Sequence, residues 1–194
     1  MKRIGITGNI GSGKSAVSSI LRTRGFTVLD ADEVALRVSS DPLTLLEVSE
    51  ALGPQYVTER GLNRPLLAEL VFKNALALET LNGIIHPRVR AQMSRLEGEA
   101  TGATVFQDIP LLFENGLEHG FNATILVDAP IKTRLERVRK RSGLTAEQFW
   151  ARENAQMSPQ QKRVRADWIV KNTGTLEQLE REVLRVLEGL DLGG

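Results

Sequence analysis

Cysteine is absent from this 194-residue sequence, and its absence excludes disulfide bonds, thiolate metal sites and a cysteine nucleophile. Aromatic residues are few as well, at 5% of the chain, so a surface that stacks nucleic-acid bases is not indicated. The formal net charge is only +1, which gives no whole-molecule field to attract nucleic acid. These absences leave a globular protein whose composition does not point to nucleic acid as a partner.

Long hydrophobic runs are also missing. Met1, Lys2 and Arg3 begin like a signal peptide, but Thr7 and Gly8 interrupt the apolar run that follows. No segment has the length of a transmembrane helix, so we expect a cytoplasmic protein with no membrane contact. With 41% hydrophobic residues, the chain is long enough for one compact domain with a buried core.

Residues 8–15, with the sequence GNIGSGKS, fit the phosphate-binding pattern G-x-x-x-x-G-K-[ST] at every fixed position. A short apolar strand is predicted over residues 3–7, and a helix that ends at Gly25 is predicted to follow this phosphate loop. Lys14 is expected to reach the β- and γ-phosphates of ATP, and Ser15 to bind Mg²⁺. The predicted nucleotide-binding residues here are Gly8, Asn9, Ile10, Gly11, Ser12, Gly13, Lys14, Ser15 and Ala16.

Two carboxylates, Asp30 and Asp32, follow a second predicted strand over residues 26–29. Side chains at the carboxyl ends of parallel strands face the ligand crevice, so each is a candidate for a general base or an Mg²⁺ contact. Asp32 could also cap a helix that begins at Glu33, and the two roles can coexist.

Two later strands also end in aspartate. Residues 103–107 lead to Asp108, and residues 123–127 lead to Asp128. Asp108 stands where a Walker-B carboxylate would, and we favour it for the Mg²⁺ contact. Asp128 is expected instead to cap the next helix.

Residues 33–101 have a helical pattern, which predicts a helical insertion that supplies the pocket for a second substrate. Helix starts are predicted at Asp41-Pro42 and at Asn63. His86 and Pro87 are expected to break the pattern before a further helix. A structural hinge is favoured over a catalytic role for His86, because phosphoryl transfer mainly needs positioning and charge stabilisation.

Residues 132–165 are strongly basic and are predicted to form a helical lid over the nucleotide. Arg134, Arg137 and Arg141 recur at helical spacing, which places their guanidinium groups on one face. Capping boxes over residues 145–148 and 158–161 predict two short helices. Lid arginines could stabilise phosphoryl charge, although a solvated basic face and a nucleic-acid patch remain alternatives.

A last strand over residues 166–170 precedes Asn172, which either contacts adenine or serves as a turn residue. An amphipathic helix then closes the chain, and the final glycines, Gly193 and Gly194, are expected to be frayed. The predicted fold is an α/β P-loop NTPase with a three-layer α/β/α arrangement, a parallel sheet, a helical substrate-binding insertion and a helical lid. Its predicted core comprises residues 1–32, 102–131 and 166–194.

These motifs together resemble the dephospho-coenzyme A kinases over nearly the whole chain. The residues that carry the resemblance are 4–15, 30–32, His86-Pro87, 110–114, Arg137, Arg141, Gln156 and 172–174. Ala16 departs from the family, which often has threonine there, but Ser15 keeps the hydroxyl that binds the metal.

The resemblance implies transfer of the ATP γ-phosphoryl group to the ribose 3′-hydroxyl of dephospho-CoA. Asp32 would then be the base, and Lys14, Arg137 and Arg141 would stabilise the phosphates. Asn172 would contact the nucleotide. The implied substrate-binding residues are Asp30, Asp32, His86, Leu111 and Glu114.

Three other functions compete with this interpretation. The nearest is a nucleoside or nucleoside monophosphate kinase of the same architecture. A regulatory nucleotide-binding switch is weakened by the lack of an Asn-Lys-x-Asp motif that reads guanine. A nucleic-acid-binding module would use the basic lid, and no obligate protein partner is predicted.

Overall fold

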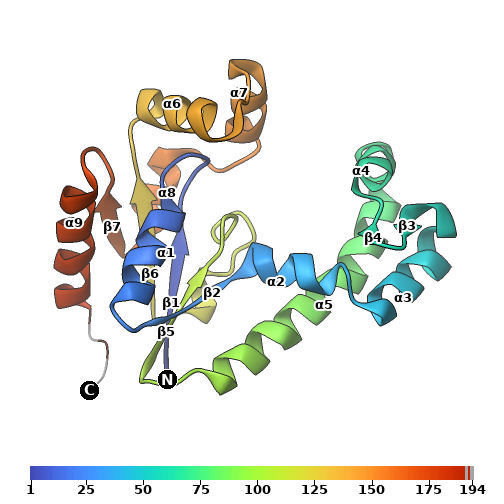
Figure 1. The fold of residues 1–194 in the computed structure, drawn as a ribbon, viewed down its shortest axis with the longest axis horizontal. Coiled ribbons are helices and arrows are strands. Elements are labelled where there is room, and N and C mark those ends of the chain that lie inside the picture. Colours follow the sequence, from blue (N-terminus) through green and yellow to red (C-terminus); the bar gives the residue numbers. More distant parts are fainter. Residues whose placement is uncertain (191, 193–194) are drawn as a thin grey trace. The chain divides into compact units, whose positions relative to one another are not determined.

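The computed structural model of the protein describes residues 1–190 and residue 192. Five strands form one sheet in the order β2-β5-β1-β6-β7 (Figure 1). The strands are β1 (Lys2–Thr7), β2 (Thr27–Asp30), β5 (Thr104–Asp108), β6 (Ala123–Asp128) and β7 (Trp168–Lys171). β1 pairs in parallel with β5 and β6, and β6 pairs in parallel with β7. The predicted parallel α/β fold is confirmed, and the carboxyl ends of these strands meet at one edge.

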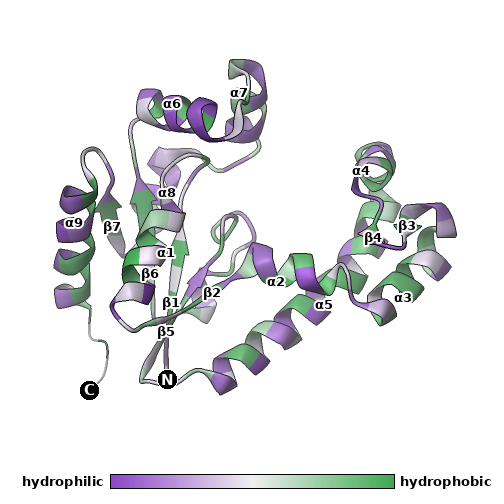
Figure 2. Ribbon diagram, in the orientation of Figure 1, coloured by the Kyte–Doolittle hydropathy of each residue, from purple (hydrophilic) through white to green (hydrophobic). Residues whose placement is uncertain are grey.

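One face of the sheet is covered by α1 (Lys14–Thr23) and α9 (Leu176–Gly189). Leu179, Val183 and Val186 recur at helical spacing on α9 and are buried against the sheet, whereas the rest of the helix is largely polar (Figure 2). Gly5 points to the opposite face, where a Cβ would lie 2.5 Å from Leu112 Cδ1. The residue is glycine because the segment after β5 packs directly on this strand.

Contacts within the chain define two compact units, Met1–Leu29 with Ala100–Gly194, and Asp30–Glu99. The second unit is mainly helical, as the sequence predicts for residues 33–101. Its helices α2, α3 and α4 each pack against α5. The elements of this unit are α2 (Ala31–Val38), α3 (Pro42–Leu52), η1 (Pro54–Tyr56), β3 (Val57–Thr58), β4 (Gly61–Leu62), α4 (Arg64–Lys73) and α5 (Ala75–Glu99).

Helix starts show where local sequence signals succeed and where they fail. Asp41 and Asn63 cap α3 and α4 as predicted. One of the two carboxylates caps α2, as expected, but it is Asp30 and not Asp32, since the Asp30 carboxylate accepts the backbone N–H groups of Asp32 and Glu33. Asp30 is the residue that retains extended backbone geometry, which an N-cap requires.

The prediction that Asp128 caps the helix after β6 is also wrong. That helix, α6 (Ile131–Ser142), starts after Pro130 and has no side-chain cap. The Asp128 carboxylate instead accepts two hydrogen bonds from Arg163, 35 residues further along the chain. A tertiary ion pair has therefore replaced the expected local contact.

Pro87 lies inside α5, so the prediction that His86 and Pro87 break the helix is wrong. An internal proline removes one backbone hydrogen bond and crowds the carbonyl four residues earlier, at a cost of about 3 kcal/mol. The residue four positions earlier is Gly83, and a Cβ there would have no described atom within 4 Å. Packing of α5 against α2, α3 and α4 explains why the helix continues despite the proline.

The predicted lid contains α6, α7 (Ala146–Asn154) and α8 (Pro159–Arg165), and η2 (Glu118–Gly120) precedes β6. The expected capping boxes are present at Thr145 and Ser158. Among the described residues, none of the helices combines the length and the apolar character needed to cross a bilayer. The expected fraying at Gly193 and Gly194 lies outside the described residues.

Candidate active site

The phosphate loop joins β1 to α1 and uses backbone geometry that favours glycine. Gly11 and Gly13 have φ angles of 77° and 96°, in the left-handed region. A Cβ at Gly13 would lie 2.1 Å from the side-chain nitrogen of Asn172, and one at Gly11 would lie 2.6 Å from the Arg134 carbonyl oxygen. Both glycines are therefore needed for the turn, Gly11 also for close packing against α6 and Gly13 for close packing against Asn172.

Lys14 begins α1, and its ammonium nitrogen lies 3.5 Å from Asp108 Oδ1 at the end of β5. The Asp108 carboxylate is buried and also accepts a hydrogen bond of 3.0 Å from Ser18. The structure thus brings together the two predicted phosphate- and metal-site residues. Their roles in catalysis stay predictions.

Arg137 and Asn172 hold the loop from the other side. Arg137 donates to the Asn172 side-chain oxygen at 3.0 Å and to the Ser12 carbonyl at 3.4 Å. The buried Asn172 amide also donates to the Ser12 carbonyl, at 2.8 Å. Arg141 is exposed and donates to its neighbour Ser142, so the guanidinium row is not one uniform face.

Arg134, the first arginine of that row, is 2% exposed and forms a buried ion pair with Glu153. Its two terminal nitrogens lie 2.5 and 2.7 Å from the two carboxylate oxygens, which is a bidentate pair. Arg134 also donates to the Ile10 carbonyl of the phosphate loop. No local sequence pattern marks Glu153 as a partner of Arg134, since the two residues are 19 positions apart.

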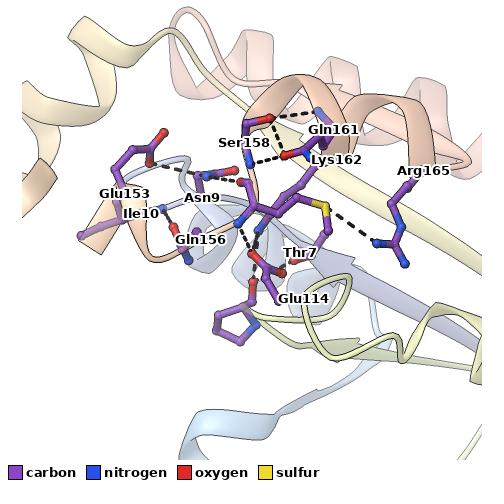
Figure 3. Close-up of polar contacts among 12 residues, drawn as sticks. Thr7, Asn9, Ile10, Glu114, Glu153, Gln156, Ser158, Gln161, Lys162 and Arg165 are labelled. Carbon is purple, nitrogen blue, oxygen red and sulfur yellow. Dashed lines mark hydrogen bonds and ion pairs between the residues drawn. The ribbon is translucent and has the colours of Figure 1, made fainter. Parts of the chain in front are cut away.

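A second set of contacts reaches Asn9 and Ile10 from residues that connect α7 and α8 (Figure 3). The Gln156 side chain accepts the Ile10 backbone N–H at 2.9 Å, and the Met157 carbonyl accepts the Asn9 side-chain amide at 3.0 Å. Glu114 in turn accepts the Met157 backbone N–H at 2.8 Å. The phosphate loop is therefore hydrogen-bonded to residues about 150 positions away.

Glu114 also pairs with Lys162, whose side chain is completely buried on α8. Burial lowers the pKa of Lys162, although the hydrogen bond with Glu114 raises it in part. Lys162 is a functional candidate that the sequence interpretation missed, because it looked like one of several basic lid residues. Leu111, which belongs to the same segment as Glu114, is 40% exposed.

The remaining predicted residues belong to the second unit. Asp32 lies exposed in the first turn of α2, directly after the Asp30 cap. His86 is exposed on α5. The contacts of Asp30, Asp32 and His86 with substrate stay predictions.

The second unit also contains a cavity of about 440 Å³ between α2, α3 and α5. Three arginines line it, Arg37, Arg88 and Arg95, together with Thr44. The Thr44 hydroxyl is buried and lacks a hydrogen-bond partner among the described residues. Each of these arginines is paired with a glutamate, Arg37 with Glu33, Arg88 with Glu47 and Arg95 with Glu99, and Asp41 also lines the cavity, so an anionic ligand would compete with carboxylates for the guanidinium groups.

The phosphate loop fits Mg²⁺ by the chemistry of its donors. Ser15 presents an exposed hydroxyl on the first turn of α1, and Asp108 presents a carboxylate. Mg²⁺ in such sites usually takes one or two protein oxygens, with phosphates and waters as its other ligands. The described residues contain no cluster of three or more histidines and carboxylates that could hold a metal alone, which agrees with that pattern.

A phosphate loop between a parallel strand and a helix, with a lysine and a carboxylate at its base, defines a P-loop phosphotransferase. The sequence model of the family described as dephospho-CoA kinase matches residues 2–178. The chain therefore belongs to the dephospho-CoA kinase family, and the prediction of a kinase is confirmed.

Individual relatives agree with this assignment. A dephospho-CoA kinase of Deinococcus radiodurans is 48% identical, with 98% of this chain and 93% of that protein aligned. One of Thermus thermophilus is 46% identical, with 98% and 92% aligned. The alternative of a nucleoside or nucleoside monophosphate kinase is not favoured.

Solved structures support the same fold. The protein TT1252 of Thermus thermophilus has a TM-score of 0.88 and 44% identity, over 97% of both chains. A dephospho-CoA kinase of Campylobacter jejuni has a TM-score of 0.66 and 29% identity, over 97% of this chain and 96% of that one. Shikimate kinase of Aquifex aeolicus, with a TM-score of 0.52 and 21% identity, shares the fold alone.

Proposed function

We propose that this protein transfers the γ-phosphoryl group of ATP to the ribose 3′-hydroxyl of dephospho-CoA, which gives coenzyme A and ADP. The observation that carries the reaction class is the Lys14 ammonium, held 3.5 Å from Asp108 at the base of the phosphate loop. The acceptor is supported by the family match over residues 2–178.

ATP binds through its phosphates to backbone N–H groups of the phosphate loop and to the first turn of α1. Lys14 contacts the β- and γ-phosphates and offsets the charge that spreads over the transferred group. Ser15 and Asp108 hold Mg²⁺, which when bound neutralises phosphate charge. Asn172 contacts the adenine side of the nucleotide, and its hydrogen bond to Ser12 fixes its side chain.

Asp32 is the proposed general base. It orients the 3′-hydroxyl and accepts its proton while the hydroxyl oxygen bonds to the γ-phosphorus. The bond between that phosphorus and the β–γ bridging oxygen breaks, and ADP leaves with the bond's electron pair. Asp30 supports this geometry because it caps α2 and so positions the first turn that carries Asp32.

Arg137 and Arg141 supply positive charge from the lid during transfer. Arg137 already contacts the loop through Ser12, whereas the exposed Arg141 is able to reorient toward a phosphate. Arginine suits this role since its planar guanidinium can bind two phosphate oxygens at once.

The second unit supplies the acceptor side. Dephospho-CoA carries a diphosphate next to its pantetheine arm, and the cavity lined by Arg37, Arg88 and Arg95 has guanidinium groups that could bind it in exchange for their present glutamate partners. His86 of this unit and Leu111 of the first unit are further proposed substrate-side residues. Glu114, which the resemblance also implies as a substrate residue, is instead bound to Lys162 and to the Met157 backbone N–H. We place the reaction in the cytoplasm, which supplies ATP, and propose no obligate protein partner.

A coupled ADP-release assay tests this function. Purified protein with ATP and Mg²⁺ is given dephospho-CoA or one of a panel of nucleosides and nucleoside monophosphates, each at the same concentrations. We expect dephospho-CoA to give the highest kcat/KM, and mass spectrometry of the product to show one added phosphate on the ribose 3′-oxygen.

Adenosine is the informative member of the panel, because it offers the same ribose without the diphosphate and pantetheine. Higher kcat/KM with a nucleoside than with dephospho-CoA would reject the proposed acceptor. No ADP release with any acceptor would reject the kinase assignment altogether.

A further inference from the structure

Lys162 is an unusual lysine, since its side chain has no exposed surface. Its ammonium lies 2.8 Å from Glu114 Oε1 and 3.5 Å from the Pro110 carbonyl. A buried ammonium is strongly unfavourable unless it is paired and hydrogen-bonded. An apolar side chain of similar length would fill the same space without that penalty, so the charge itself needs an explanation.

The same Glu114 oxygen that binds Lys162 accepts the backbone N–H of Met157. Gln156 and Met157, which we call the 156–157 turn, then contact two consecutive residues of the phosphate loop, Asn9 and Ile10. Figure 3 shows this chain of contacts from the Lys162 ammonium to the loop. A change at Lys162 can therefore reach the phosphate loop through Glu114 and the 156–157 turn.

We propose that Lys162 and Glu114 are positioning residues that hold the 156–157 turn against Asn9 and Ile10, and thereby fix the phosphate loop for ATP. This proposal rests on the proposed function only where turnover of dephospho-CoA is measured, and the binding of an ATP analogue does not depend on it. Lys162 does not touch substrate. Its ammonium holds the Glu114 carboxylate in the position from which it binds Met157.

The contacts on the loop explain why small displacements matter. Phosphate binding depends on several backbone N–H groups that point to the same few oxygens, and a shift of about 1 Å can cost about 100-fold in rate. The Ile10 N–H is bound by Gln156 and the Ile10 carbonyl by Arg134, so residues of the lid orient both peptide groups that flank Ile10. Release of the 156–157 turn would free one of these two contacts.

Lys162→Met tests the proposal, with Lys162→Arg as the conservative variant and Lys140→Met as the matched control. Lys140 is an exposed lysine on α6, so its replacement makes the same chemical change away from the network. Equilibrium binding of a fluorescent ATP analogue, steady-state KM for ATP and for dephospho-CoA, and thermal unfolding are measured for each protein.

We expect Lys162→Met to weaken ATP-analogue binding and raise KM for ATP by about 10- to 100-fold, with KM for dephospho-CoA within about twofold. Lys162→Arg should recover most of the affinity, and Lys140→Met should match the original protein. Unchanged ATP binding in Lys162→Met, with only a lower unfolding temperature, would overturn the proposal, because the pair would then only stabilise the fold.

If Lys162→Met does not fold, folded Glu114→Gln decides by itself: weaker binding of the ATP analogue than in the original protein supports the positioning role, and unchanged binding overturns it. If Lys162→Met does fold, the double variant with Glu114→Gln adds a second comparison. The amide retains an oxygen for the Met157 N–H, so Glu114→Gln should weaken ATP binding less than Lys162→Met. If the residues act through each other, the loss in the double variant is smaller than the product of the single losses. Independent losses would overturn the proposal.

Nucleotide binding needs no acceptor, so this series gives a result even if dephospho-CoA is not the substrate. Failure of the proposed function would appear in the turnover of the original protein. Failure of the positioning role would appear in the binding of the ATP analogue by the variants.

Discussion

Lys14 places a positive charge at the base of the phosphate loop, and it does so from the first turn of α1 rather than from the core. Lys14→Met removes that charge and keeps most of the side chain's volume. We expect kcat to fall by about 100- to 1,000-fold, because the ammonium interacts most strongly with charge that develops during transfer. The measurement is steady-state turnover with dephospho-CoA, together with circular dichroism to verify folding.

Lys73→Met serves as the control for this experiment, since Lys73 is exposed at the end of α4. It should leave kcat unchanged. Near-normal turnover in folded Lys14→Met protein would contradict the assignment of Lys14 to the phosphates.

The two carboxylates at the start of α2 can be separated by experiment. Asp32→Asn keeps the shape of the side chain and removes the proton acceptor, so single-turnover transfer should slow by about 100- to 10,000-fold at saturating ATP. Asp30→Asn should have a smaller effect, because asparagine caps helices as well as aspartate does.

The structure adds a third variant to this comparison. Asp30→Ala removes the cap whose carboxylate accepts the N–H groups of Asp32 and Glu33, which should destabilise the protein by about 1 kcal/mol. A large loss of transfer in Asp30→Asn, with little loss in Asp32→Asn, would identify Asp30 as the base.

At the scale of elements, α6 carries arginines in three different environments. Arg134 is buried, Arg137 contacts the loop, and Arg141 is exposed. Arg137→Ala should weaken ATP binding and lower kcat, since it releases both Ser12 and Asn172. Arg141→Ala should lower kcat with little change in ATP affinity, because its contact with phosphate forms only as charge develops.

Arg139→Ala is the control on the same helix, at an exposed position. Binding of an ATP analogue and kcat are measured for all three variants. If Arg137→Ala and Arg141→Ala both behave like Arg139→Ala, this face of the helix is a solvated basic surface.

α9 is joined to the end of β7 by Glu182, which accepts hydrogen bonds from Arg185 and from the Lys171 backbone N–H. The Arg185 hydrogen bond is the main reason that the pKa of Glu182 lies below its ordinary value of 4.5. A carboxyl group whose pKa is lowered by folding stabilises the folded state at pH values above its ordinary pKa. This stabilisation is lost as the pH falls through the lowered pKa.

Glu182→Gln should therefore be less stable than the original protein at pH 7, by less than about 1 kcal/mol for a partly exposed pair. The difference should shrink as the pH falls from 4.5 through the lowered pKa of Glu182. Urea unfolding across this range measures it, with the exposed Glu188→Gln as control. If the difference in the free energy of unfolding is the same at every pH, the charge of Glu182 does not contribute to stability.

At the scale of the whole molecule, four basic residues of the lid are paired with carboxylates of the protein, whereas others, such as Arg139, Lys140 and Arg141, are exposed. The four pairs are Arg134–Glu153, Lys162–Glu114, Arg163–Asp128 and Arg165–Glu118. With a net charge of +1, we expect only weak binding to mixed-sequence single-stranded RNA.

Fluorescence anisotropy between about 50 and 200 mM salt measures this binding and its salt dependence. A small salt slope at every concentration agrees with a kinase of small molecules. Tight binding that falls by about 1,000-fold or more over this range would instead indicate a nucleic-acid surface.

The features predicted from the sequence depend on short stretches of chain. The phosphate loop needs eight consecutive residues, and the Thr145 and Ser158 capping boxes need four each, so neighbouring residues suffice to identify them. The strands were predicted because their apolar runs are short and rich in β-branched residues, and the parallel arrangement was expected from the phosphate loop between a strand and a helix.

Most of the features that were missed have distant partners. The exception is the cap of α2, which is Asp30 although Asp32 is equally suitable by residue type. Asp128 was assigned a local cap because its partner, Arg163, belongs to another helix. The burial of Glu153 on α7 and of Lys162 on α8 depends on how these helices pack near the phosphate loop. No local sequence pattern encodes that packing. Pro87 was expected to end a helix because propensity does not include the packing of α5 against its neighbours.

Gly83 and Pro87 give α5 a built-in weak turn. Pro87 has no N–H for the Gly83 carbonyl, and the open space at Gly83 allows water to reach that group. Native-state hydrogen exchange should therefore be faster around residues 83–88 than in the turns of this 25-residue helix directly before and after them. His86 lies in that turn, so the NMR signal of its imidazole ring would report local opening of the helix.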